Sequence, residues 1–189
     1  MMRNLESNSS ILEKEVPDGI EAEKGVADFL ARNFSCIINV DRNRSETDDK
    51  NGIDMLADIE YEEKIYKLAV EVSGPDKERR EEKAKRQWRT PVVSLHDEKG
   101  KPRGESMPRI LIGYNVGYFL SRQKEAEAQG LSISEVLTDR EKHDLKRNIL
   151  LEILNQINIL ATDHNYFKRI KEIRKAFEEE KADLEELGI

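Results

Sequence analysis

Two acidic residues, Asp54 and Glu71, stand in a pair of β-like runs, NGIDMLADI and KIYKLAVEV, that are joined by a short charged turn. Alternation along the second run sends Val70 and Val72 to one face of a strand and Glu71 and Ser73 to the other. A turn at YEEK would bring the carboxylate of Asp54 near that of Glu71. Two carboxylates held together in a sheet are costly as bare charges, and a divalent cation that prefers oxygen ligands relieves this cost. Because such an ion activates water and neutralises charge on a phosphate, the pair predicts metal-dependent phosphate chemistry. In the alternative interpretation, both carboxylates end in solvent at the sheet edge.

The rest of the chain predicts an α/β domain with a mixed sheet that contains this hairpin. Residues 97–108 hold two prolines and two glycines, which predicts an exposed loop, and SISE offers a capping box. Asp18 and Asp163 are candidate caps for the first and last helices. In chain order, apolar spacing predicts helix 20–34, strand 35–43, hairpin strands 53–59 and 64–72, helix 76–88, strand 109–114, helices 118–129 and 140–156, strand 157–163, and a helix from His164.

Composition and charge set limits on the class of protein. The 189 residues are 37% hydrophobic, without the apolar run of a signal peptide or a stretch near the ~20 apolar residues of a membrane span. We therefore expect a cytoplasmic protein without membrane contact. The net charge of −7 argues against a general nucleic-acid coat, but residues 76–109 carry eleven Lys and Arg against seven Asp and Glu. That basic segment suits a phosphate-handling surface; the alternative is a solvated helix face.

The predicted domain occupies residues 18–177, after a flexible arm over residues 1–17 and before an acidic helical extension over residues 178–189. The last helix carries an apolar stripe at heptad spacing, with a polar gap at Glu180. Core packing explains most such stripes. The alternative is self-association into a homodimer through this C-terminal helix. The stripe consists of Tyr166, Ile170, Ile173, Phe177, Leu184 and Leu187.

Three segments in order, EKGVADFLARNFSCIINVDRNR, GIDMLADI and LAVEVSG, resemble the PD-(D/E)XK nuclease superfamily, especially its Holliday-junction-resolvase-like and restriction-endonuclease-like members. The likeness covers about residues 19–90, and the strands at 109–114 and 157–163 look like the closing strands of that fold. The resemblance implies a restriction-endonuclease-like mixed sheet flanked by helices, magnesium or manganese as cofactor, and DNA as the substrate. Branched DNA or another nucleic acid is a further substrate that the resemblance allows.

Carried over residue by residue, the resemblance makes Asp54 and Glu71 the metal-binding carboxylates and Glu23 the glutamate of the first helix. Gln87 matches the polar residue that many relatives carry on the helix after the third strand. Ser73 is the departure. In the family a lysine stands there, which orients or deprotonates the attacking water, and serine has neither its charge nor its reach.

A lysine from the next helix offers a replacement for the one missing at Ser73. If Gln87 faces the site, Lys83 and Arg80 lie on the same stripe of that helix. A long lysine stem would then deliver its ammonium to the place that a strand lysine would fill. The alternative is that Lys83 is one more solvated charge.

Three functions follow from these alternatives. The first is a metal-dependent nuclease acting on DNA, with Lys83 in place of the lysine absent at Ser73. The second is a catalytically degenerate nuclease fold that serves as a nucleic-acid-binding or protein-assembly module. The third, an interaction protein without phosphate chemistry, requires that Asp54 and Glu71 point apart.

Overall fold

A computed structural model describes residues 18–42, 52–74, 77–97, 99–113, 115–162 and 167–186. The predicted arm over residues 1–17 and the predicted cap Asp163 lie outside the described residues. The elements are α1 (Asp18–Asn33), β1 (Ile37–Asp41), β2 (Met55–Tyr61), β3 (Lys64–Val72), α3 (Lys77–Arg89), β4 (Val92–His96), β5 (Pro102–Ile112), α4 (Val116–Gln129), α5 (Ile133–Val136), α6 (Asp139–Leu160) and α7 (Phe167–Glu186).

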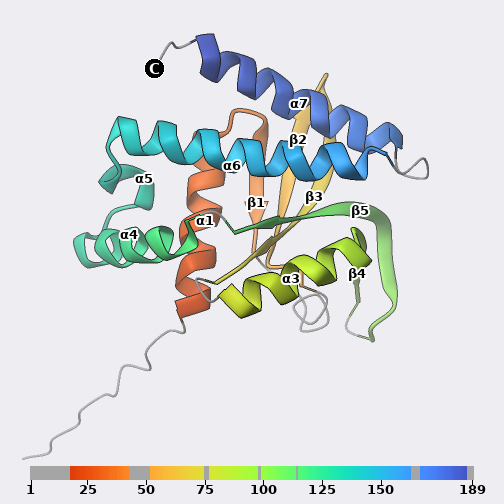
Figure 1. The fold of residues 1–189 in the computed structure, drawn as a ribbon, viewed down its shortest axis with the longest axis horizontal. Coiled ribbons are helices and arrows are strands. Elements are labelled where there is room, and N and C mark those ends of the chain that lie inside the picture. The colour runs from red at the N-terminus through yellow and green to blue at the C-terminus, as the bar shows by residue number, and fades with distance from the viewer. Residues whose placement is uncertain are drawn as a thin grey trace, which may run out of the picture.

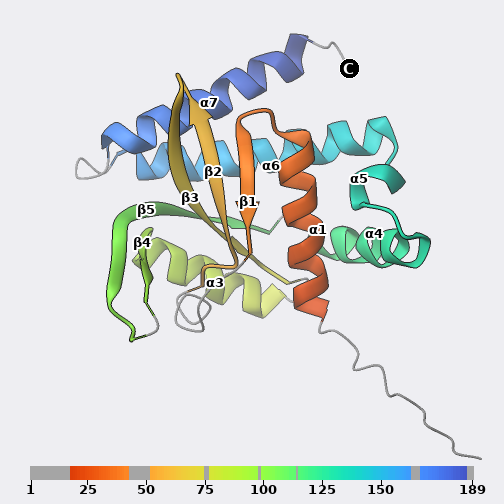
Figure 2. The same cartoon turned by 180° about the vertical axis from the view of Figure 1, so that it is seen from behind.

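The strands of the described ranges form one mixed sheet in the order β1-β2-β3-β5-β4. Strands β3 and β5 run parallel, and the other neighbouring pairs are antiparallel. Helix α1 lies beside β1, while α6 and α7 run side by side across the strands (Figures 1 and 2). The predicted α/β class, the mixed sheet flanked by helices and the long C-terminal helix are confirmed. Among the described helices, none is long and apolar enough to cross a membrane.

Side chains of the β2–β3 hairpin alternate between two apolar clusters. Val70 and Val72 belong to the larger core, to which α1, α4, α6 and α7 contribute. Leu56 and Ala69 face the other way and join a smaller cluster with residues of β4 and β5. Because successive side chains of a strand alternate, Glu71 lies on the side of Ala69, away from the larger core. The hairpin thus anchors its valines and presents its glutamate on the opposite face.

The turn of this hairpin has two residues, Glu62 and Glu63, between the paired Tyr61 and Lys64. Their φ angles are 49° and 60°, so both lie in the left-handed region that most residues other than glycine and asparagine disfavour. A two-residue turn with both φ angles positive matches the right-handed twist of the strands. The turn geometry therefore suits the hairpin, although glutamate is an unfavourable residue type at both turn positions.

We expect the double substitution of Glu62→Asn with Glu63→Gly to raise the free energy of unfolding by about 1 kcal/mol, because Asn-Gly adopts this turn without strain. Urea unfolding measures the change. The double substitution to Gln removes the same two charges but keeps the strain, so it should give almost none of the gain. Equal stabilisation by the Gln pair would attribute the effect to charge and contradict the prediction.

The predicted exposed loop over residues 97–108 is wrong in its second half. Strand β5 begins at Pro102 and pairs with β4, a strand that the sequence did not reveal. Pro102 is the first residue of its strand, and Pro108 precedes Arg109, where the described pairing with β3 begins. Proline is tolerated at such positions because a missing N–H does not break a ladder there. The prolines and glycines that suggested a loop are compatible with this strand.

The predicted strand over residues 157–163 is also wrong, since residues 157–160 form the last turn of α6. Ile149, Ile153 and Ile157 are buried at helical spacing, so packing overrides the β propensity of isoleucine. The preceding turn also pairs with the sheet: the Gln156 amide donates to the Leu111 carbonyl at 2.7 Å and accepts from its N–H at 2.8 Å. The helix thus satisfies the backbone of β5 where a further strand was expected.

The apolar stripe of α7 is buried within the chain. Ile170, Ile173, Phe177 and Leu184 all belong to the larger core, while Tyr166 and Leu187 lie outside the described residues. The polar gap at Glu180 is only 2% exposed, and its carboxylate accepts from the Ser35 hydroxyl and the Cys36 N–H and pairs with Lys146. Core packing therefore accounts for the stripe. A homodimer through this helix stays a prediction.

Candidate active site

Asp54 and Glu71 are held together by the register of the hairpin. Asp54 directly precedes β2, and its N–H donates to the Val70 carbonyl at 2.9 Å. Its Oδ2 accepts from the Val72 N–H at 2.6 Å, so the carboxylate is oriented across the end of β3. Asp54 is 8% exposed and Glu71 is fully buried. The two carboxylates therefore do not end in solvent as separate surface charges.

Helix α3 adds an ammonium group between these carboxylates. Lys83 Nζ donates to the Val72 carbonyl at 2.6 Å and lies 3.5 Å from Asp54 Oδ2 and 3.6 Å from Glu71 Oε1. Three oxygen atoms from the hairpin thus surround a single cation. The predicted stripe of α3 does bring Lys83 to the two carboxylates.

Two arginines complete the surroundings of Glu71. Arg86 Nη2 donates to Glu71 Oε1, and Arg109 Nη1 lies 3.8 Å from Oε2. Arg109 is 1% exposed and is tied to α3, since its Nη2 donates to the Arg86 carbonyl at 3.0 Å. The Glu71 Oε2 atom is buried, and it has no hydrogen-bond partner among the described residues.

Burial raises the pKa of the Glu71 carboxyl, and the charges of Lys83 and Arg86 oppose this rise while that of Asp54 adds to it. Burial likewise lowers the pKa of the Arg109 guanidinium, and the charge of Glu71 opposes that change. Three cations face two carboxylates, so with all five groups ionised the described site carries one net positive charge without any metal ion.

Gly52 leaves the space that the Arg86–Glu71 ion pair needs. Its φ is +74°, and a Cβ there would lie 2.5 Å from Arg86 Nη2 and 2.9 Å from Glu71 Oε1. A side chain at this position would therefore be strained in the backbone and would also push into the ion pair. Steric exclusion of a side chain thus explains why glycine stands at position 52.

We expect Gly52→Ala to lower the free energy of unfolding by about 2–3 kcal/mol, because it combines left-handed strain with crowding of the fully buried Glu71 carboxylate and loss of its bond from Arg86. Gly100→Ala is the matched control. Gly100 has nearly the same φ, +72°, but no atom within 4 Å of its Cβ position, so only the backbone cost of about 1 kcal/mol should appear. Chemical unfolding of both variants measures the difference, and equal losses would show that the crowding at Gly52 is harmless.

Ser73 is buried where β3 leaves the sheet. Its N–H donates to the Ile112 carbonyl at 3.0 Å, and its hydroxyl donates to the Gly74 carbonyl at 3.3 Å. Next to it, a Cβ built on Gly113 would lie 3.3 Å from Arg80 Cδ and 3.4 Å from the Ser73 hydroxyl. Arg80, the other predicted member of the α3 stripe, is thus close to Ser73, and its side chain is exposed.

The remaining predicted residues lie as follows. Glu23 is on α1, and its Oε2 lies 3.9 Å from Arg42 Nη2. In the part of the chain that is described, no three His, Cys, Asp or Glu side chains form a group that could hold a metal ion, so Glu23 does not complete such a group with Asp54 and Glu71. Gln87 lies in α3, but its side chain is outside the described part of the structure.

Sequence reasoning missed Arg86, Arg109 and the carbonyl of Val72. Arg86 stands three residues after Lys83, and therefore on the same side of α3, so helical spacing could have revealed it. Arg109 begins the apolar run RILI, and a charged residue in a buried strand calls for a partner. A backbone carbonyl leaves no mark in the sequence.

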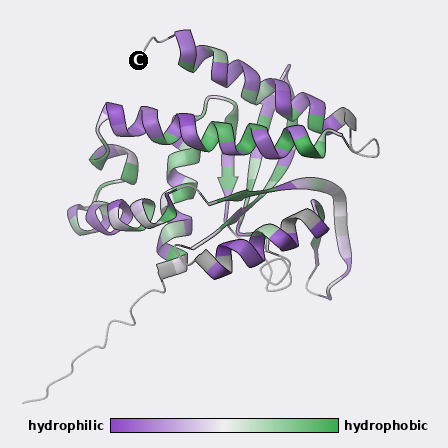
Figure 3. Cartoon of the chain, viewed as in Figure 1, coloured by the Kyte–Doolittle hydropathy of each residue, from purple (hydrophilic) through white to green (hydrophobic). Residues whose placement is uncertain are grey.

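Figure 3 shows α3 as a largely hydrophilic helix, in contrast to the hydrophobic second half of α6.

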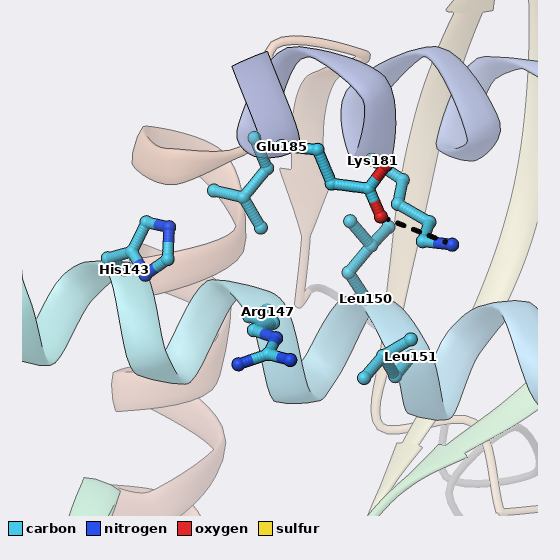
Figure 4. Close-up of a pocket in the computed structure, with 7 residues that line it drawn as sticks. His143, Arg147, Leu150, Leu151, Lys181 and Glu185 are labelled. Carbon is cyan, nitrogen blue, oxygen red and sulfur yellow. Dashed lines mark ion pairs between the residues drawn. The ribbon is translucent and has the colours of Figure 1, made fainter. Parts of the chain in front are cut away.

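A separate pocket of about 420 Å³ lies between α6 and α7 (Figure 4). His143, Arg147 and Leu151 line it from α6, and Lys181 and Glu185, whose charged atoms are 3.4 Å apart, line it from α7. None of the predicted site residues contributes to its wall. The carboxylate site is therefore distinct from this pocket.

Comparisons with known proteins give no match: no family model fits this chain, and no curated protein or solved structure is significantly similar to it. A function must therefore be argued from the site itself. That site combines two buried carboxylates, a backbone carbonyl and three cations at the junction of the hairpin with α3 and β5.

Proposed function

We propose that the protein is a metal-dependent nuclease that hydrolyses phosphodiester bonds of DNA, branched or end structures included. Asp54 and Glu71 form its metal site, and Lys83 takes the role of the lysine that is absent at Ser73. The observation that carries this proposal is the position of Lys83 Nζ, within 3.6 Å of both carboxylates and of the Val72 carbonyl. An ammonium at this point is close enough to act on a phosphate bound to a metal ion that these oxygens would hold.

The donor set fits magnesium or manganese, because both ions prefer carboxylate and carbonyl oxygens. Asp54, Glu71 and the Val72 carbonyl would hold the ion, with the hydrogen bond from Val72 N–H fixing the orientation of the aspartate. A bound ion of this kind supplies activated water and neutralises charge on the phosphate. Two carboxylates in a partly hydrated site bind such ions weakly, and we expect dissociation constants of ~0.1 to several mM.

The protein's own groups supply the remaining requirements of the reaction. Lys83 brings a positive charge to the point where negative charge develops on the phosphate. Helix α3 carries seven Lys and Arg against three Asp and Glu, so it attracts the DNA backbone although the whole chain is acidic. The order of helix, strand, hairpin and basic helix supports membership of the PD-(D/E)XK superfamily and a restriction-endonuclease-like fold.

A degenerate nuclease fold, serving as a nucleic-acid-binding or protein-assembly module, is the second candidate. The ion pairs of Glu71 with Arg86 and Arg109 favour it, because they compensate the charge of the buried carboxylate without any metal ion. In this case the two carboxylates and α3 form a structural cluster whose exposed cations bind phosphates.

Cleavage of supercoiled plasmid separates the two candidates. The nuclease should nick the plasmid with manganese, and EDTA should stop the reaction. Asp54→Asn, purified in parallel, should leave the plasmid intact, because it removes one of the two metal-binding carboxylates. Intact plasmid with the wild-type protein would favour the binding module, and nicking that persists in Asp54→Asn would show that the site lies elsewhere.

A further inference from the structure

We infer that Lys83 and Arg86 hold the carboxylate pair closed in the absence of metal and that a DNA phosphate draws them away, so that DNA and the divalent ion bind cooperatively. This inference rests on the proposed function and concerns the regulation of the same site.

The two α3 cations and a metal ion need the same oxygen atoms. Lys83 Nζ lies among Asp54 Oδ2, Glu71 Oε1 and the Val72 carbonyl, and Arg86 Nη2 bonds to the same Glu71 Oε1. These three oxygens are also the donors that suit a hard divalent ion. A metal ion therefore cannot be added beside the ammonium but must replace it.

The charges lead to the same conclusion. With three cations facing two carboxylates, the closed site has one net positive charge when all five are ionised. A divalent ion entering that arrangement would meet three like charges around one small volume. Release of Lys83 and Arg86 from the carboxylates removes two of them and frees Glu71 Oε1.

The exposure of the side chains indicates which cations can leave. The side chain of Lys83 is 27% exposed and that of Arg86 is 41% exposed, whereas that of Arg109 is 1% exposed. The two α3 cations can turn outward with their stems along the helix, while Arg109 stays beneath Glu71. The site therefore has a fixed cation and two exchangeable ones.

A DNA phosphate is the ligand that would favour the open arrangement. Arginine binds phosphate oxygens in a bidentate manner, and lysine adds a point charge beside it. Once these groups pair with phosphate, the two carboxylates keep only Arg109 as counter-charge, and their affinity for a divalent ion rises. By linkage, the ion must raise the affinity for DNA by the same factor.

Manganese titration by calorimetry, without DNA, tests the competition directly. Lys83→Met keeps the apolar stem but removes the charge, and Lys85→Met removes the same charge from an exposed position of α3. We expect Lys83→Met to bind manganese about tenfold more tightly than the wild type, and Lys85→Met to match the wild type within about twofold. Thermal unfolding without metal checks that both variants are folded.

The reciprocal measurement uses fluorescence anisotropy of a short labelled duplex at constant ionic strength, with and without calcium, and with a gel to verify that the duplex is intact. Calcium should tighten DNA binding by about fivefold or more in the wild type and much less in Lys83→Met, where the competing charge is already gone. Lys85→Met should keep the full calcium effect.

The outcomes separate this inference from the proposed function. Equal manganese affinities in the wild type and both Met variants would overturn the inference but leave the metal site in place. Absence of manganese binding in all proteins, or equal heats from the wild type and a double variant of Asp54→Asn with Glu71→Gln, would instead overturn the metal site of the proposed function.

Discussion

Lys83→Ala is expected to lower manganese-dependent nicking of plasmid DNA by about 10²- to 10⁴-fold, the range for loss of one acid-base or electrostatic group. Lys83 Nζ is the described ammonium that lies beside both carboxylates and the Val72 carbonyl, so its loss removes the positive charge from the reacting phosphate. The same change should improve metal affinity, because the ammonium competes for the metal's oxygens. In Lys83→Ala, the nicking rate should therefore fall while the affinity for manganese rises.

Lys85→Ala is the matched control for this experiment, since it removes one exposed lysine from the same helix. Its nicking rate should stay within about twofold of the wild type, apart from a small loss through weaker DNA binding. Robust cleavage by Lys83→Ala would contradict the role given to this residue. Equal losses in both variants would mean that α3 acts only through its general charge.

Moving the lysine from position 83 on α3 to position 73 after β3 tests the proposed role of Lys83 in a second way. Ser73→Lys in the Lys83→Ala background returns one ammonium to the strand position where the resemblance places the lysine. We expect part of the lost cleavage to return. Ser73→Lys alone should give no gain, because it would add a cation at a buried position close to Arg80, in a site that already carries one net positive charge. For a degenerate fold, the opposite holds: the wild type is inert and Ser73→Lys alone restores some cleavage.

The hairpin and its carboxylates could be predicted from the sequence because local rules govern them. Strict alternation places Val70 and Val72 in the core, and a two-residue turn then fixes the register that brings Asp54 to the end of β3. The stripe of α3 is equally local, since residues three or four apart share one side of a helix. The position of Lys83 beside the two carboxylates follows from this rule, while its catalytic role stays a proposal.

Other parts of the fold depend on contacts that the sequence pattern does not reveal. The turn at residues 157–160 reads as a strand by composition, but its isoleucines continue the buried side of α6. Pro108 lies within strand β5 and is harmless there only because the described pairing with β3 begins at the next residue, Arg109. In the same way, Arg109 gains its role from the parallel pairing of β5 with β3, which sets it against Glu71. Tertiary context decides each case.

Arg109→Met is expected to lower the free energy of unfolding by about 3 kcal/mol at neutral pH, because Glu71 loses the cation beside its buried Oε2 atom. Arg109 is 1% exposed, lies 3.8 Å from the fully buried Glu71, and donates to the Arg86 carbonyl. Arg89→Met, which removes an exposed arginine of α3, should change stability by no more than about 0.5 kcal/mol. Urea unfolding in EDTA compares the two variants.

The loss in Arg109→Met should shrink as the pH falls. Burial raises the pKa of Glu71 above its ordinary value of 4.5, so the folded protein takes up this proton at a higher pH than the unfolded chain does. Stability therefore gains a contribution as the pH falls through the raised pKa toward the ordinary value, the reverse of the usual carboxylate. Without Arg109 the pKa of Glu71 should rise further, and the variant should recover more stability than the wild type as the pH falls from about 8 toward the ordinary pKa of 4.5. Adding Glu71→Gln should restore most of the loss at pH 8 and abolish this difference in pH dependence. If the double variant is no more stable than Arg109→Met alone, the cost lies in lost packing of the arginine, and the Glu71 charge does not control it.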